Sequence, residues 1–172
     1  YYSLDYRGVH FVCLYTEAAL QSAPSLGARQ IEWLRRDLDA TSARQIFVLM
    51  HKPMWEYPKA GWESIHAVLK RHPVRAVLAG HFHHYYKSKT VDGIQYYVIG
   101  PTGGQVFSPE LAGGLTHYCL LNIQGDAYTL ALVRPGAILP DDYIVEGDYK
   151  DMEKLRHVAS GAQRCGNARC AG

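Results

Sequence analysis

Two short apolar runs, each preceded by an amphipathic segment, constrain the fold of this chain most strongly. The runs are residues 46–50 and 74–79, and both have the length of a strand. Apolar side chains recur at helical spacing in residues 26–38 and again in residues 62–71, immediately before the two runs. Helices that alternate with fully apolar strands are typical of an α/β fold with a parallel sheet.

Turn residues predict β-hairpins at the start of the chain and in its second half. Three pairs of alternating or apolar segments are each separated by a short turn that contains glycine. The turns are Tyr6-Arg7-Gly8, Asp92-Gly93 and Gln124-Gly125-Asp126. We therefore expect hairpins from residues 2–5 with 9–16, from 85–91 with 94–99, and from 116–123 with 127–133.

Composition bounds the size of the fold and its partners. The 172 residues, 48% of them hydrophobic, are enough for one globular domain, and no apolar run has the length of a membrane span. With 18 Lys and Arg against 16 Asp and Glu, the net charge of +2 predicts no nucleic-acid footprint. We place the domain at residues 1–134 and a C-terminal extension at 135–172, helical near residues 149–158 and mobile after that.

Three histidines lie where the two buried strands end. His51 follows the first apolar run, while His81 and His83 follow the second after Gly80. The carboxyl ends of neighbouring parallel strands meet at one edge of a sheet, so these rings should converge. Neutral imidazole binds divalent transition metals, and this pattern predicts a metal site, with solvated loop histidines as the alternative. His84 adjoins the pair, where it could contact an anion or serve only the loop.

The cysteines do not decide the compartment. Cys13 and Cys119 lie in apolar alternating segments, where we expect small buried hydrophobic residues. Cys165 and Cys170 could close a small disulfide loop or offer two thiolates to a metal. No second Cys or His pair lies nearby in the sequence to complete a metal site, and a disulfide would need an oxidising compartment.

Taken together, two motifs resemble a known family. The strand that ends at His51-Lys52-Pro53, and the strand that ends at Gly80-His81-Phe82-His83, are similar to the His-x-Pro turn and the Gly-His-x-His signature of calcineurin-like metallophosphoesterases. The likeness is to the carboxyl-terminal half of that family. It implies part of a four-layer α/β/β/α sandwich that hydrolyses a phosphate-ester substrate with a hydroxide bridging two divalent ions of Mn, Fe or Zn.

The resemblance also implies residue roles. His51 and His81 would bind the second metal ion and His83 the first, while His84 would contact substrate. Lys52 stands where the family often has another histidine, and Tyr15 where it often has aspartate. A histidine-triad nucleotide hydrolase is the weaker alternative, because its third histidine position holds Tyr85.

Several family motifs are absent from the sequence. There is no Asp-x-His and no Gly-Asn-His, and the two Gly-Asp pairs, Gly125-Asp126 and Gly147-Asp148, fall too late in the chain. Three histidines without a bridging carboxylate would hold metal loosely. We therefore expect a fragment that lacks the N-terminal half of the domain and is inactive alone. The alternative is a non-catalytic domain with a structural or weak metal-binding role.

Overall fold

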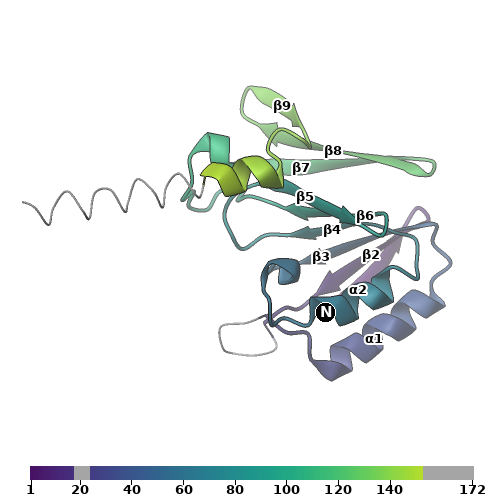
Figure 1. Ribbon diagram of the computed structural model, residues 1–172. Coiled ribbons are helices and arrows are strands. Elements are labelled where there is room, and N and C mark those ends of the chain that lie inside the picture. The colour runs from purple at the N-terminus through teal and green to yellow at the C-terminus, as the bar shows by residue number, and fades with distance from the viewer. Residues whose placement is uncertain (18–23, 153–172) are drawn as a thin grey trace, which may run out of the picture.

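The computed structural model describes residues 1–17 and 24–152 (Figure 1). Two α-helices and two 3-10 helices are distributed among nine strands in this part of the chain. The strands are β1 (Tyr2–Tyr6), β2 (Val9–Leu14), β3 (Gln45–Met50), β4 (Val74–Ala79), β5 (Tyr86–Val91), β6 (Ile94–Val98), β7 (Tyr118–Gln124), β8 (Ala127–Arg134) and β9 (Ala137–Pro140). The helices are α1 (Gly27–Ala40), η1 (Met54–Glu56), α2 (Trp62–Leu69) and η2 (Glu110–Ala112), and residues 146–152 are also helical.

Six strands form the central sheet in the order β1-β2-β3-β4-β6-β5. The inner strands β2, β3, β4 and β6 are parallel, and the edge strands β1 and β5 pair antiparallel with their neighbours. Parallel strands are covered on both faces, which explains why β3 and β4 are apolar nearly throughout. The predicted parallel sheet and the mixed α/β class are confirmed.

Helices α1 and α2 cover one face of this sheet, which is the lower face in Figure 1. Leu34 and Leu38 of α1 and Ile65 of α2 are buried against Val48 and Val77 of the central strands. The opposite side of α1 is exposed and charged. The apolar spacing of residues 26–38 therefore identifies the buried side of a helix that runs two residues further.

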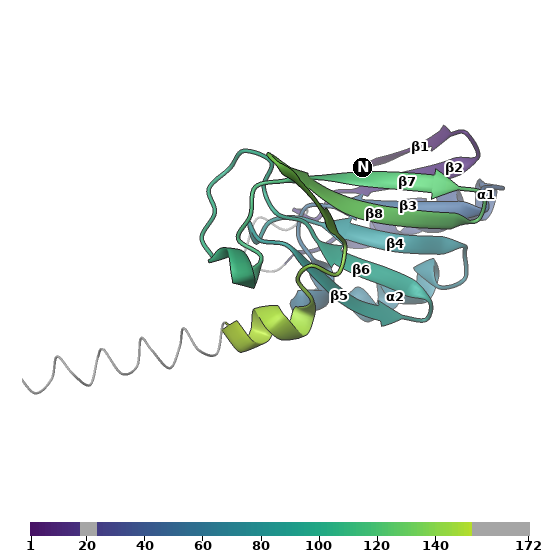
Figure 2. The same cartoon turned by 90° about the horizontal axis from the view of Figure 1, so that it is seen from above.

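A second sheet, in the order β7-β8-β9, covers the other face (Figures 1 and 2). Leu130 and Leu132 of β8 pack with Phe47 and Tyr97 of the central sheet. The described residues thus form three layers, and they contain no fourth, helical layer outside the second sheet. All three predicted hairpins are present.

The segment after residue 134 begins as part of the second sheet. Strand β9 pairs with β8, so the sheet extends into the residues that we expected to form a C-terminal extension. Helix formation begins at residue 146, and the remainder of the predicted helix, together with Cys165 and Cys170, lies outside the described residues. Cys13 and Cys119 are free and only partly buried, which differs from the expected full burial. No helix in the described part of the chain is long and apolar enough to cross a membrane.

Candidate metal centre

His51 and His81 lie side by side at the carboxyl ends of β3 and β4. Met50 and Ala79 are partners in the parallel register, and the Gly80 amide donates a hydrogen bond of 2.9 Å to the His51 carbonyl oxygen. This bond ties the two loops together directly after the sheet. The predicted convergence of these two histidines is therefore present in the structure.

The two rings are spaced as metal ligands are. His81 Nδ1 lies 3.2 Å from His51 Nε2, with ring centroids 5.0 Å apart. Two imidazole nitrogens on one tetrahedral Zn²⁺, each about 2.0–2.1 Å from the ion, are about 3.3 Å apart. The two nitrogens share a hydrogen bond in the structure, and their separation is also that of two ligands on one divalent ion.

His83 points toward a different loop. Its Nδ1 donates to the Gln105 carbonyl oxygen over 2.6 Å, and its ring stacks on Phe107 at 5.2 Å between centroids. A carbonyl oxygen only accepts, so Nδ1 carries the proton and Nε2 of the neutral ring keeps the lone pair that a metal needs. Both His81 (φ 72°) and His83 (φ 57°) adopt left-handed backbone conformations, and their rings have different partners, His51 for His81 and Gln105 for His83.

The described residues do not complete a metal site. They contain no group of three His, Cys, Asp or Glu side chains close enough together to hold an ion. Only the pair His51 and His81 of the three predicted ligands is brought together, and His83 is held separately by Gln105. The donors that the described residues bring together are thus of the kind that a transition metal prefers, but they are too few to hold one.

An ion pair that sequence reasoning missed lies beside the histidines. Lys52 Nζ lies 2.7 Å from Glu17 Oε2, and the Lys52 amide donates to Thr16 Oγ1. Lys52 holds the pKa of Glu17 below its ordinary value. Burial, and then the positive charges of His51 and Lys52, lower the pKa of His81 and so favour the neutral ring that binds metal. Nothing in the local pattern around Glu17 predicts this contact, because it joins loops 35 residues apart.

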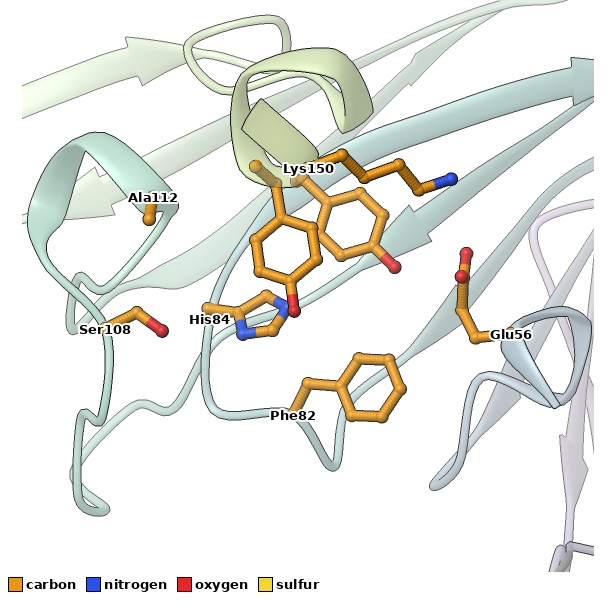
Figure 3. A pocket seen from close by; sticks show the side chains of 8 residues that line it. Glu56, Phe82, His84, Ser108, Ala112 and Lys150 are labelled. Carbon is orange, nitrogen blue, oxygen red and sulfur yellow. The ribbon is translucent and has the colours of Figure 1, made fainter. Parts of the chain in front are cut away.

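A cavity of about 480 Å³ opens next to this site (Figure 3). It is lined mostly by aromatic and polar side chains, which come from four separate segments. They are Glu56, Phe82, His84, Tyr86, Ser108, Ala112, Tyr149 and Lys150. Phe82 stands between the predicted ligands His81 and His83 in the chain, so the metal centre and the cavity share one loop.

His84 lies on the cavity wall and is almost fully buried. It is 5% exposed, and its Nε2 has no hydrogen-bond partner among the described residues. Burial lowers its pKa to about 4, with a smaller contribution from His83. His84 is therefore neutral near pH 7, so its ring offers hydrogen-bonding nitrogens and no positive charge to the cavity. Its place between the loop and the cavity suits the predicted substrate contact.

Trp55 and Trp62, two tryptophans near the site, pack into the core. Trp62 is buried, and it meets Trp55 and Tyr96 in edge-on or tilted arrangements. Tyr57 lies near the cavity, with its ring 6.0 Å from that of Phe82. The aromatic side chains that face the cavity are thus mostly ones that the sequence did not single out.

Comparison with known proteins agrees with the histidine motifs. Residues 2–85, which contain both motifs, match the family model of the calcineurin-like phosphoesterases. The chain is 30% identical over 122 residues to purple acid phosphatase 21 of Arabidopsis thaliana, covering 61% of this chain and 27% of that protein. A crystal structure of a dimetal phosphatase from Danio rerio is also similar, with a TM-score of 0.43 at 18% identity over 69% of this chain and 38% of the other. The chain thus spans well under half the length of either relative.

Proposed function

We propose, from the match of residues 2–85 to the family model of the calcineurin-like phosphoesterases, that this chain carries part of the active site of a metal-dependent phosphoesterase. The observation that supports this most directly is the pair His51 and His81, whose nitrogens lie 3.2 Å apart at the carboxyl ends of two parallel strands. Binding sites of open α/β sheets gather at that edge. The substrate would be a phosphate ester.

His51 and His81 would hold one divalent ion, and His83 would hold a second through its free Nε2. Ions of Mn, Fe or Zn bound there would polarise a phosphoryl oxygen and lower the pKa of a water molecule that attacks phosphorus. Gln105 fixes the tautomer of His83, and Lys52 helps to keep His81 neutral. His84 would contact the substrate from the cavity side.

The remaining metal ligands would come from a segment outside the printed sequence. Structural and catalytic zinc sites use at least three protein ligands, and the described residues bring only two together. Two neutral rings also leave the charge of two adjacent cations unbalanced. We therefore propose that an N-terminal half of the domain supplies carboxylates and that the 172-residue chain alone is inactive.

Exposed apolar side chains on the second sheet support the four-layer arrangement. Tyr118 and Leu120 of β7 and Ile138 of β9 are more than half exposed on the outer face of that sheet. A large apolar surface of this kind is usually covered. We propose that a further layer of the complete domain packs there, which would give the α/β/β/α sandwich.

Metal binding and hydrolysis test this proposal separately. Calorimetry on the 172-residue chain should show weak Zn²⁺ or Mn²⁺ binding that His81→Ala reduces at least tenfold. His72→Ala, at a partly buried histidine outside the site, should leave it unchanged. The longer protein that includes the upstream segment should hydrolyse an aryl phosphate with Mn²⁺, and His81→Ala should abolish that activity. An unchanged rate in His81→Ala would refute the site assignment.

A non-catalytic domain is the second candidate, and the incomplete donor set favours it. It predicts the same weak metal binding by His51 and His81. It also predicts that the longer protein hydrolyses no phosphate ester with Mn, Fe or Zn. Activity of the longer protein distinguishes the two candidates.

A further inference from the structure

We propose that the cavity beside the histidine pair binds a planar aromatic group, so that the phosphoesterase acts on phosphate esters of aromatic alcohols. That the substrate is a phosphate ester rests on the proposed function, whereas the binding of an aromatic ring rests on the cavity alone. The cavity volume of about 480 Å³ is within the range of sites for small organic ligands. Its walls, its charge and its position each limit what can occupy it.

The position of the cavity joins it to the metal centre through Phe82. The Phe82 ring lies 5.8 Å from the ring of His81 and 5.5 Å from that of His84, centroid to centroid. His81 faces His51, and His84 faces the cavity. Phe82 therefore contacts both a residue of the histidine pair and a residue of the cavity wall, so a phosphoryl group held at the pair would have the cavity on the other side of Phe82.

Four aromatic rings line the cavity. Tyr86 and Tyr149 stack in parallel, 4.9 Å apart at an angle of 4°, and Tyr149 also stacks on His84 at 4.2 Å. The Phe82 ring, labelled in Figure 3, lies 5.5 Å from the His84 ring, centroid to centroid. Aromatic rings attract one another in stacked and edge-on arrangements beyond the effect of area alone. A flat ring ligand would extend this stack, whereas an alkyl group would gain only the buried area.

The charges of the cavity exclude the phosphate itself as its occupant. One carboxylate, Glu56, and one ammonium group, Lys150, lie on its rim, and Lys150 also contacts Glu146. The charges of these two groups cancel. A phosphate dianion would gain nothing here over solvent, because anion sites need a net positive field. By contrast, the positive charge of Lys52 acts on His81 at the metal centre.

The buried polar atoms of the cavity suit the edge of a substituted ring. His84 Nε2 is buried and has no hydrogen-bond partner within residues 1–17 and 24–152, and an unsatisfied buried polar atom is destabilising. Ser108 and Glu56 add a hydroxyl and a carboxylate on facing sides. A ring that carries hydrogen-bonding groups at its edge could satisfy these atoms, as an aliphatic chain could not.

Binding of an aromatic ring in the cavity is tested on the metal-free 172-residue chain by NMR titration with phenol, cyclohexanol and inorganic phosphate. Phenol should shift the signals of Phe82 and His84, cyclohexanol should bind several-fold more weakly, and phosphate should leave these signals unchanged. Phe82→Leu keeps an apolar side chain but removes the ring, and it should weaken phenol binding about two- to tenfold. Tyr118→Leu, which removes an exposed ring on β7, is the matched control and should change nothing.

Equal binding of phenol and cyclohexanol, or an unchanged phenol affinity in Phe82→Leu, would overturn the inference. The substrate class is tested on the longer protein, where kcat/KM for phenyl phosphate should exceed that for glycerol phosphate and Phe82→Leu should reduce this ratio. A ratio of one would also overturn the inference. Phenol binding that persists when the longer protein hydrolyses neither ester would support an aromatic site and refute the phosphoesterase.

Discussion

His10 provides a sharp test of how this fold is held together, because its buried ring joins the first hairpin to helix α1. His10 Nδ1 contacts Asp5 and Nε2 contacts Asp37, each at 2.9 Å, and Ser3 also donates to Asp37. Two carboxylates accept from the two nitrogens, so the ring carries both protons. Burial lowers the pKa of His10, but the hydrogen bonds and charges of both aspartates outweigh this and leave the pKa raised.

The two aspartates should contribute unequally to stability. The side chain of Asp37 is 17% exposed and that of Asp5 is 71% exposed, so solvent screens the second contact far more strongly. A hydrogen bond to a charged group contributes about 1.5–3 kcal/mol when it is buried, and an exposed ion pair about 0–1 kcal/mol. We therefore expect Asp37→Asn to lower the free energy of unfolding by about 2 kcal/mol, and Asp5→Asn by less than half of that.

The pH dependence follows from the raised pKa. A histidine whose folded-state pKa lies above its unfolded value, about 6.5, stabilises the protein fully below that value and loses the contribution as the pH rises through the folded pKa. Urea unfolding of the 172-residue chain at pH 5.5 and pH 9 should show a large loss in Asp37→Asn at the lower pH only. Ser3→Ala controls for the hydroxyl contact. Equal losses in the free energy of unfolding at both pH values, or a larger loss in Asp5→Asn, would refute the contribution of a charged His10 ring bonded to Asp37.

Two further predictions concern packing. Gly113 has φ +80°, and a Cβ atom there would lie 1.9 Å from the Tyr85 carbonyl oxygen, so Gly113→Ala should lower the free energy of unfolding by more than about 3 kcal/mol. Gly136 has the same φ but open space around it, so Gly136→Ala should lower it only by the backbone strain of about 1–2 kcal/mol. Comparable losses in guanidinium unfolding would contradict the close contact. Leu34 is fully buried on α1, so Leu34→Ala should lower the free energy of unfolding by about 3 kcal/mol in the same assay. Leu111 is 67% exposed, so Leu111→Ala should change it by less than about 0.5 kcal/mol. Equal effects would show that α1 is not packed as described.

The strand and helix order was predictable from the sequence because burial imposes a local pattern. Residues 74–79 are apolar nearly throughout, as a strand covered on both faces must be, and they form β4 with the same bounds. Asp92-Gly93 turns the chain between β5 and β6 for an equally local reason, since this dipeptide tolerates the positive φ of a tight turn. The second sheet's third strand, β9, was missed because it is only four residues long and contains a proline.

The sequence by itself determined the class of the fold and the convergence of His51 with His81, because parallel neighbouring strands end at one edge of a sheet. Only the tertiary structure decided that His83 turns away, since its direction depends on a left-handed backbone and on a carbonyl oxygen 22 residues later. The pairing of Lys52 with Glu17 and the aromatic cavity around His84 are also tertiary. Their side chains come from segments far apart in the chain, and no local periodicity records which distant loops will meet.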